Sequence, residues 1–548
     1  MKWNVKKTGY LFLLVLTAAV TGCSQDRQGE NDTLSEVLPL TWFSDVSFWH
    51  PPEDWDCSED TVQGVLTQKT GLTFEMEIPP EDAETKLSWM LANGELPDII
   101  SITDEKMIDK LTASGEVWRM DEFLETYDPD SHLLKDFPGD IKEGLTERDG
   151  GWYALPSHLS SEDNRARYAE ISTFYQELQK YHENNAVIIN EQLMEASGIT
   201  LEELKTETGF VQALQKVRSM GLSVNGKPVI PLLYDGNAYQ ESSLPFLQMN
   251  FGAVPVNDER HYQDILRDPN YKHALHFMNR TIREGYADMK QLTMDNSEIK
   301  KLFSEERVFA FIGNIANTGY DSSLCWISPG AIYSDTGASP VYGKNFRNLG
   351  WIQTFISKEN PYPGETAKFL SYVTSEEGLM LLFYGIEGKD YTLDAAGKAI
   401  RAENGEKREE TGLNIYWPFV NTDWSYTVMP EPDPDTRSGK SQIMTKNAGS
   451  AYVLDERTEM YDASLVNLSD KYLDFTDGEE ETRENLEAYK KKLTAQIVTA
   501  PDEESVEALY REMLDTMDGM GLPDIEKKTD QKMQECSQRM QRDACNGE

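Results

Sequence analysis

Two kinds of hydrophobic pattern alternate along residues 39–102, and this alternation limits the folds that are open to the chain. The segments 39–44, 72–79 and 96–102 have the apolar spacing of strands. Between them, 61–71 and 81–94 have helical spacing, and each ends in glycine. Strand, helix, strand, helix, strand is the order of a wound α/β sheet. We therefore predict an α/β fold.

The rest of the chain predicts a second lobe and a hinge. From about 157 to 306 the pattern is mostly helical, broken by a predicted hairpin at Asn225-Gly226 and a strand. Strand patterns return at 307–317 and 349–357, where they can complete the first sheet. The predicted lobe 1 is 38–156 with 307–357, and lobe 2 is 157–306 with 358–548. Repeated chain crossings between two lobes make a hinge beside a central ligand cleft.

The N-terminus has the pattern of an export signal. An apolar run of twelve residues, 9–20, follows three lysines and is too short for a membrane helix, which needs about 20. Residues 1–22 are therefore predicted to be a signal peptide. Its end, Val20-Thr21-Gly22-Cys23, resembles the lipobox of bacterial lipoproteins. The resemblance implies an acylated Cys23, a flexible linker over 23–37, and a body tethered to the outer face of the cytoplasmic membrane.

The net charge of the chain argues against polyanionic partners. Against 52 basic residues the chain has 95 acidic ones, and its formal net charge is -43. Nucleic acids and anionic lipid surfaces require clustered Lys and Arg, so neither is predicted as a partner. Such a charge favours solubility, and a cationic ligand is the alternative interpretation. The five cysteines lack zinc spacing; Cys536 and Cys545 are close enough in sequence to bridge, and free thiols are equally compatible.

No catalytic or metal motif stands out, and neither a cofactor nor a metal site is predicted. The segment 221–228 nearly matches a phosphate loop, but Pro228 replaces the required Ser or Thr. His273 and His276 lie three residues apart without an evident third ligand. Pairs of carboxylates for glycoside hydrolysis are too numerous for any one to be selected. We predict a protein that is not an enzyme, with a cell-surface glycoside hydrolase as the alternative.

Six motifs together resemble one protein family. In chain order they are GELPDII, EVWRMDEFLETYDP, DGGWYALPSH, TIREGYADMKQLTM, RVFAFIGN and FYGIEGKDYTLDAAGK. They resemble the carbohydrate-type extracellular solute-binding lipoproteins of ABC importers, in the large Gram-positive subgroup, over about residues 38–525. The resemblance implies a periplasmic-binding-protein-like fold, a monomer that closes on an oligosaccharide, and delivery to the permease transmembrane subunits. The aromatic insertion 44–57 departs from the family pattern, so the family's ligand is not carried over. A peptide or polyamine receptor is a further alternative, consistent with the acidity of the chain.

Candidate ligand contacts follow from the chemistry of a sugar. A sugar ring has apolar C–H faces and a hydroxyl rim, which suit aromatic platforms with a few polar groups. In wound sheets, ligands bind beyond the carboxyl ends of the strands. The candidates are Trp42, Ser44, Asp45, Trp49, Asp104, Trp152, His158, Asp235, Asn314, Asn317, Trp417 and Trp424. Trp351, inside a predicted strand, and Trp89 and Trp118, on helical patterns, are expected in the core.

Overall fold

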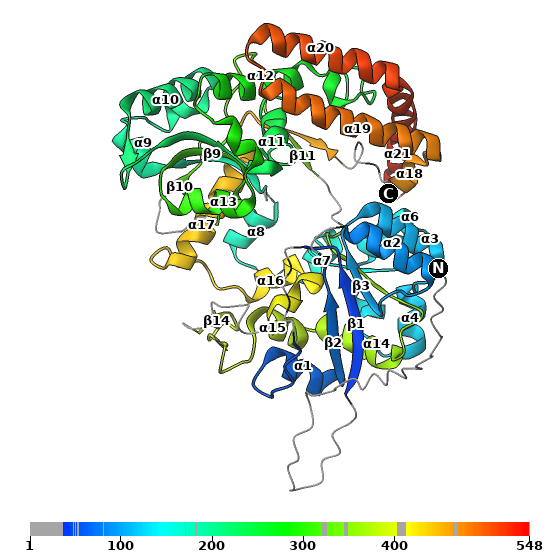
Figure 1. The fold of residues 1–548 in the computed structure, drawn as a ribbon. Coiled ribbons are helices and arrows are strands. Elements are labelled where there is room, and N and C mark those ends of the chain that lie inside the picture. The colour runs from blue at the N-terminus through cyan, green and yellow to red at the C-terminus, as the bar shows by residue number, and fades with distance from the viewer. Residues whose placement is uncertain are drawn as a thin grey trace, which may run out of the picture.

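The computed structural model shows two lobes, each built around its own β-sheet (Figure 1). None of the helices it describes has the length and hydropathy needed to cross a bilayer. The predicted signal peptide, Cys23 and nearly all of the predicted linker lie outside the described residues, as does Cys545's side chain. The structure describes residues 37–47, 49, 51, 54–79, 82–169, 171–180, 183–319, 326–344, 349–402, 413–463, 466, 468 and 470–546.

Lobe 1 contains a five-stranded sheet, and its first half follows the predicted order of elements. Its strands, in sheet order, are β2 (Leu72–Glu77), β1 (Leu38–Ser44), β3 (Ile99–Ile102), β12 (Gln353–Ile356) and β4 (Leu155–Pro156). The first three are parallel, and β12 is antiparallel to both of its neighbours. The helices of this lobe are α1 (Val62–Thr70), α2 (Ala83–Asn93), α3 (Glu105–Ser114), α4 (Met120–Tyr127), α5 (Leu133–Asp136), α6 (Gly139–Asp149), α7 (Glu162–Arg167), α14 (Pro363–Val373), α15 (Glu376–Tyr384), η6 (Leu413–Phe419) and α16 (Thr422–Val428).

Lobe 2 contains a four-stranded sheet. Its strands, in sheet order, are β10 (Trp326–Ile327), β5 (Asn185–Asn190), β9 (Val308–Asn314) and β8 (Ile230–Tyr234). Its helices are α9 (Glu191–Ala196), η1 (Glu202–Lys205), α10 (Glu207–Met220), η2 (Gly236–Ala238), α11 (Ser243–Asn250), η3 (Ile265–Arg267), α12 (Pro269–Arg283), η4 (Met289–Thr293), α13 (Asn296–Ser304), η5 (Ile315–Thr318) and α17 (Arg437–Val453). A C-terminal group follows, with α18 (Asp470–Leu473), α19 (Asp477–Val498), α20 (Glu503–Met520) and α21 (Leu522–Asn546).

Small hairpins and ribbons complete the molecule. The predicted turn at Asn225-Gly226 joins two short strands, and Asn225 has a φ of 49° there. These small sheets are β6 (Ser223–Val224) with β7 (Lys227–Pro228), β13 (Tyr391–Leu393) with β14 (Ala399–Arg401), and β11 (Val341–Lys344) with β15 (Glu459–Asp462).

Both sheets are covered by apolar layers on their two faces. In β1, Leu40 and Trp42 join one core cluster and Phe43 joins the cluster on the opposite face. In β5, alternate residues do the same, with Val187 on one face and Ile188 on the other. Strands that are buried on both faces carry continuous apolar runs. This explains why the sequence of β1 predicts a strand but does not identify the strands beside it.

The structure corrects the predicted lobe boundaries. The strand predicted over 307–317 is β9, and it pairs with β5 and β8 in lobe 2 and not with the lobe 1 sheet. Conversely, the segment 358–428 was assigned to lobe 2, but its helices α14, α15 and α16 carry residues of the lobe 1 core. The strand predicted over 349–357 does complete the first sheet, as β12. Hydrophobic periodicity identifies an element, whereas its sheet is decided by long-range pairing.

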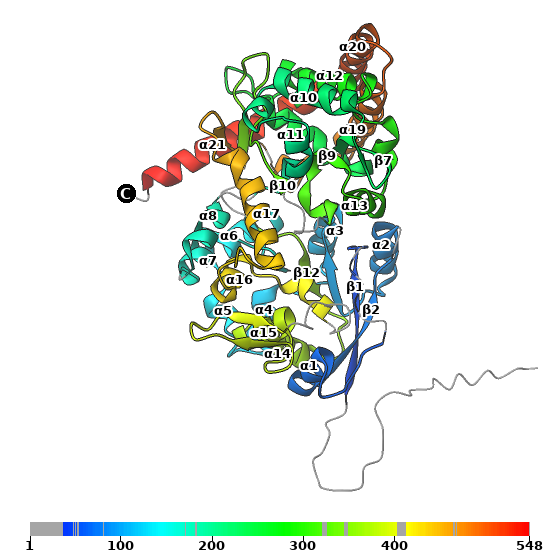
Figure 2. The ribbon, with the colours of Figure 1, turned by 90° about the vertical axis from the view of Figure 1, so that its left-hand side faces the viewer.

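Three segments join the lobes. The chain crosses between α7 and β5, between β11 and β12, and between α16 and α17. The first crossing contains α8 (Thr173–Lys180), which lies between the two lobes (Figures 1 and 2). Tyr175 of this helix stacks on Tyr426 of lobe 1 at 5.1 Å, and Glu177 is ion-paired with Lys446 of lobe 2.

Candidate functional site

The edge of lobe 1 that faces lobe 2 is formed by strand ends. β1, β3 and β4 point the same way and β12 points the opposite way. The residues that follow the first three strands and precede β12 therefore share one edge: Asp45, Asp104, His158 and Trp351. Figure 2 shows the tips of β1 and β3 directed toward lobe 2.

The facing edge of lobe 2 is rich in side-chain amides. β8 and β9 are parallel and end at Tyr234 and Asn314, while antiparallel β5 begins opposite Asn314 at Asn185. Asn184 precedes β5, and Asn317 lies in the η5 turn after β9. We call Asn184, Asn185, Asn314 and Asn317 the amide edge. Helix α13, which packs on η5, lies on the side of lobe 2 that faces α3 of lobe 1 (Figure 2).

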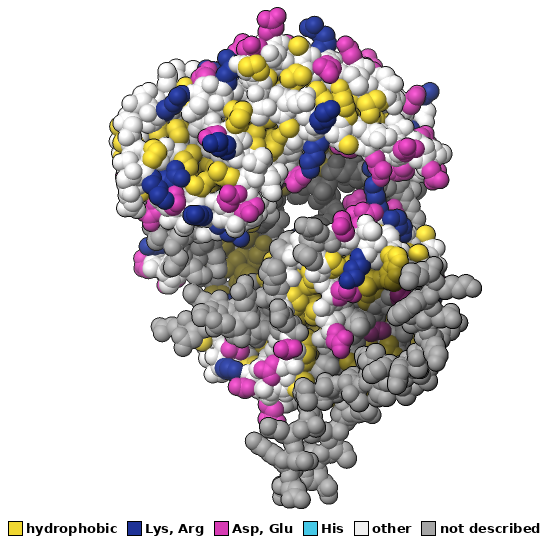
Figure 3. Space-filling view, in the orientation of Figure 1, with side chains coloured by type: hydrophobic (Ala, Val, Ile, Leu, Met, Phe, Trp, Pro, Cys, Tyr) yellow, Lys and Arg dark blue, Asp and Glu magenta, His cyan; other side chains and the backbone are white. Residues whose placement is uncertain are grey.

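A hollow separates the two edges. Figure 3 shows it between the two halves of the molecule, with hydrophobic side chains visible inside it. Helix α8, in the first crossing, and α17, which follows the third, lie on one side of the molecule (Figure 1). The edges of both lobes can therefore reach one molecule bound between them.

The acidic side chains at the lobe 1 edge form hydrogen bonds that stabilise the local backbone. The carboxylate of Asp45 accepts hydrogen bonds from the backbone N–H groups of Thr103 and Asp104 at 2.8 and 3.0 Å, and from the Thr103 hydroxyl at 3.1 Å. It thereby ties the end of β1 to the end of β3. Burial raises the pKa of Asp45, although these donors oppose the shift. Asp104 caps α3 by accepting from the N–H of Met107 at 2.8 Å.

The same device recurs in lobe 2. Asp235 is 3% exposed, and its Oδ2 accepts from the Asn314 N–H and from the Asn317 amide, both at 3.0 Å. Asn314 in turn caps η5 by accepting from Ala316. Asp235 is thus a buried support for the amide edge and not a surface group. Each lobe uses the carboxylate of one strand end to hold the backbone after a neighbouring strand.

Four of the predicted tryptophans lie in the core instead of the cleft wall. Trp42, Trp49, Trp152 and Trp424 are at most 2% exposed, and Ser44 is also fully buried. Trp42 meets Trp49, Phe74 and Phe369 edge-on, at centroid distances between 5.3 and 6.0 Å. The prediction placed these rings by their position in the chain, and the side chains point into the sheet packing.

A cluster of rings does reach the cleft edge. We call His158, Trp351, Tyr416 and Trp417 the ring cluster. Trp417 stacks with Tyr416 at 4.8 Å and with His158 at 5.7 Å. The indole of Trp351 stands nearly perpendicular to both Trp417 and His158, at interplanar angles of 86° and 71°. With 39% of its surface exposed, Trp351 is the member of the cluster that is most open to a ligand.

The backbone holds this cluster in place. His158 has a φ of 57°, its N–H donates to the Val420 carbonyl at 2.6 Å, and its Nδ1 lies 2.9 Å from the Ser157 hydroxyl. Gly350 has a φ of 93° and passes so close to Ser157 that a Cβ there would lie 2.5 Å from its carbonyl oxygen. Only glycine fits this approach, and the next residue, Trp351, donates its N–H to the same carbonyl at 2.8 Å.

The imidazole at this edge is neutral. Burial lowers the pKa of His158 to about 4, because the charged form loses its hydration among the rings. The ring cluster therefore carries no positive charge at neutral pH. It presents apolar ring surface together with the polar atoms of an imidazole.

A buried polar hub links the first crossing to lobe 1. Asp423 is fully buried and accepts from Asn164 at 2.7 Å, from Gln179 at 2.9 Å and from Ser160 at 3.1 Å. Gln179 belongs to α8, so the hub anchors that helix on α16. Burial raises the pKa of Asp423, and the hydrogen bonds from Asn164 and Ser160 oppose the shift.

In the described part of the chain, no group of three His, Cys, Asp or Glu residues is placed to hold a metal ion. His273 pairs with Glu207 and His276 with Glu507, each at 2.8 Å, so the two histidines serve separate helix contacts.

Sequence reasoning missed two parts of the site. Trp351 was expected in the core, but it precedes β12, and the neighbouring Gly350 was the available signal for a turn there. Trp89, also expected in the core, is 58% exposed on α2. Asn184 and Asn185 were not selected because the strand that they begin was not predicted.

The fold is similar to that of several solved structures, although no sequence comparison finds a match. No family model and no curated protein matches the sequence. Among solved structures, the ABC-transporter substrate-binding protein FusA of S. pneumoniae, in complex with kestose, is similar over 91% of this chain and 100% of its own, with a TM-score of 0.68 and 16% identity. An "HMO binding" ABC-transporter-associated solute-binding protein from Bifidobacterium longum infantis has a TM-score of 0.63 and 13% identity, and the match covers 91% of this chain and 99% of its own.

A third similar structure is the N-glycan transport protein NgtS of Streptococcus pneumoniae in complex with Man1GlcNAc. It covers 90% of this chain and 99% of its own, with a TM-score of 0.54 and 14% identity. At such low sequence identities, the structural similarity shows the fold alone. The chain has the two-lobed fold of these binding proteins.

Proposed function

We propose that this protein is the extracellular oligosaccharide receptor of an ABC importer. The observation that carries the proposal is Trp351, a partly exposed indole held in the ring cluster at the strand-end edge of lobe 1. An indole face suits the C–H face of a sugar, and amides suit its hydroxyls. The similar structures, two of them solved with bound sugars, support the same ligand class.

The proposal commits to an uncharged oligosaccharide. Asp45 and Asp235 are already engaged by backbone and amide donors, and His158 is neutral. The edges described above thus offer rings and amides, whereas an anionic sugar calls for a positively charged partner. Of the earlier candidates, Asp45, Asp104, His158, Asn314, Asn317 and Trp417 remain as proposed edge residues, with Trp351 added.

Binding works by closure of the lobes. A ligand that contacts both edges stabilises the closed form in proportion to its greater affinity for that form. The permease transmembrane subunits would receive the ligand from the closed receptor. We further propose that acylated Cys23 tethers a monomeric body to the outer face of the cytoplasmic membrane.

The test is calorimetry of the mature protein against a panel of neutral oligosaccharides, their uronate counterparts, short peptides and spermidine. A neutral oligosaccharide should bind, and Trp351→Ala should weaken its affinity at least about tenfold, the equivalent of about 1.4 kcal/mol. Trp89→Ala is the matched control, because Trp89 is an exposed tryptophan of the same lobe.

Three outcomes would reject the proposal. Tighter binding of spermidine or a peptide would favour the alternative receptors. Release of shortened sugars, followed by mass spectrometry, would favour a glycoside hydrolase. Equal losses in Trp351→Ala and Trp89→Ala would remove the assigned role of Trp351.

A further inference from the structure

The lobes also touch on a side of the molecule away from α8 and α17 (Figure 1). Lys106 in the first turn of α3, in lobe 1, forms an ion pair with Glu484 of α19, in the C-terminal group of lobe 2. Nearby, the short helix α18 lies against α6 of lobe 1. Figure 1 shows these contacts on the side of the molecule opposite α8 and α17.

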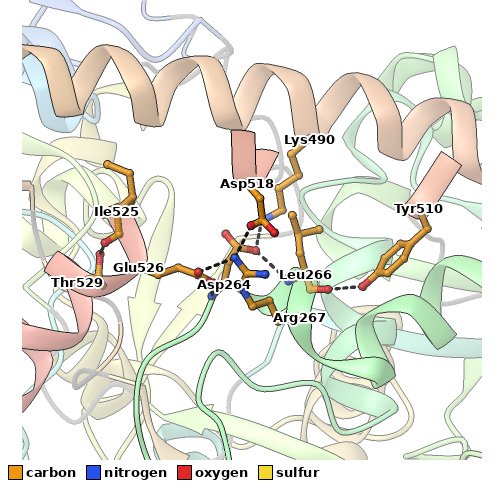
Figure 4. A network of polar contacts seen from close by, with 9 residues as sticks. All are labelled: Asp264, Leu266, Arg267, Lys490, Tyr510, Asp518, Ile525, Glu526 and Thr529. Atoms are coloured by element: carbon orange, nitrogen blue, oxygen red, sulfur yellow. Dashed lines mark hydrogen bonds and ion pairs between the residues drawn. The ribbon is translucent and has the colours of Figure 1, made fainter. Parts of the chain in front are cut away.

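The C-terminal group is fixed to lobe 2. Arg267 makes a two-pronged ion pair with Glu526 of α21, at 2.7 and 2.8 Å, and also contacts Asp518 of α20 at 2.6 Å (Figure 4). Lys490 of α19 pairs with Asp264 at 3.3 Å. Leucine, isoleucine and valine side chains of α19 belong to the lobe 2 core. Helix α19 must therefore move with lobe 2.

The start of α19 is held as firmly. Thr476 and Glu479 form a reciprocal capping box, and Lys528 of α21 binds Glu479 at 2.7 Å. Lys528 also lies 5.0 Å from the ring of Phe475, just before the helix. Glu484, in the second turn, is thereby presented from a fixed position.

The partner in lobe 1 is equally tied to its sheet. Lys106 follows Asp104, the N-cap of α3, by two residues. Asp45 holds the same turn to the end of β1. The Lys106–Glu484 pair thus joins two fixed supports, one from each lobe, and its formation depends on how far apart the lobes lie. The interaction raises the pKa of Lys106 and lowers that of Glu484.

We propose that Lys106, Glu484 and the α18–α6 contact form a clasp that stabilises the arrangement of the lobes seen in this structure, from the side opposite α8 and α17 (Figure 1). The clasp tunes ligand affinity and release, and in this respect it rests on the proposed function. The two side chains are 44% and 54% exposed. An exposed ion pair contributes little free energy and is screened by salt. The clasp therefore shifts the balance between lobe arrangements only slightly.

The test uses charge reversal in the full mature chain. Lys106→Glu and Glu484→Lys should each open the lobes, measured as a larger radius of gyration in small-angle X-ray scattering at low salt. The double variant, with both charges exchanged, should restore the scattering curve. Lys491→Glu is the matched control, because its partner Glu241 is in the same lobe and the pair is similarly exposed, at 66% for each side chain.

Ligand affinity gives a second, separable readout. For the neutral oligosaccharide chosen by the calorimetric screen, each single reversal should weaken binding about two- to fivefold, the range expected of an exposed ion pair. Salt at about 0.5 M should remove most of the difference, because it screens exposed charges.

Identical scattering for the wild type and both single variants would overturn the clasp. So would a double variant that sums the two losses instead of restoring the wild-type behaviour. If no oligosaccharide binds the wild type, the proposed function fails, and the scattering comparison still decides the clasp.

Discussion

The two lobes present different kinds of side chain at the proposed ligand cleft. Lobe 1 supplies rings, of which Trp351 is the most open, and lobe 2 supplies amides that are supported by the buried Asp235. In both lobes the carboxylates at strand ends hold backbone N–H groups. The comparison teaches that a polar residue after a strand is as readily a structural cap as a ligand contact. Exposure and the hydrogen bonds already formed separate the two roles.

The largest expected effect concerns the rings that lobe 1 uses for packing. Trp42→Ala should lower the free energy of unfolding by about 3–5 kcal/mol, because it removes a fully buried indole and leaves a cavity between Phe74 and Phe369. Trp351→Ala should cost about 1 kcal/mol or less, since the ring is partly exposed. Urea unfolding followed by circular dichroism measures both.

Equal losses of stability in Trp42→Ala and Trp351→Ala would contradict the distinction between packing rings and cleft rings. They would mean that Trp351 is a packing residue like Trp42, as the sequence had indicated. Binding of the oligosaccharide by Trp351→Ala with wild-type affinity would lead to the same conclusion.

The next largest effect is the pH dependence of stability that His158 gives to the lobe 1 edge. The pKa of His158 is lowered to about 4 by burial, from an ordinary value of 6.5. Between pH 6.5 and pH 4, His158 is protonated in the unfolded chain but stays neutral in the folded protein. The free energy of unfolding therefore falls as the pH falls through this range. The full contribution is about 3 kcal/mol. His158→Asn, which tolerates the left-handed backbone, should remove this share of the pH dependence.

The measurement is the free energy of unfolding of both proteins at pH 7 and at pH 4.5. Carboxylates elsewhere titrate in both chains and cancel in the difference. Curves that stay parallel over this range would show that His158 is not a neutral member of the ring cluster.

Much of the architecture was predictable because it depends on local patterns. Glycines at 71 and 94 ended helices as expected, and both have positive φ. The strand β9 was predicted, but its partner was not, since β5 and β8 select it by long-range pairing. For the site, the strand-end rule found Asp45, Asp235 and Asn314 at the cleft edges. It could not tell which side chains the fold would engage, because that depends on neighbours brought together only by folding.

The smallest expected effect tests whether the amide edge of lobe 2 touches the ligand. Asn184 is exposed and precedes β5 next to Asn314. Asn184→Ala should leave the free energy of unfolding unchanged and weaken oligosaccharide affinity about two- to tenfold, the equivalent of one hydrogen bond. Asn93→Ala, at an exposed asparagine of lobe 1, is the control. If Asn184→Ala binds normally while Trp351→Ala does not, the result would favour a ligand held by lobe 1 alone. Such a ligand would give lobe closure no driving force, because closure needs contacts that form only when both lobes meet the ligand.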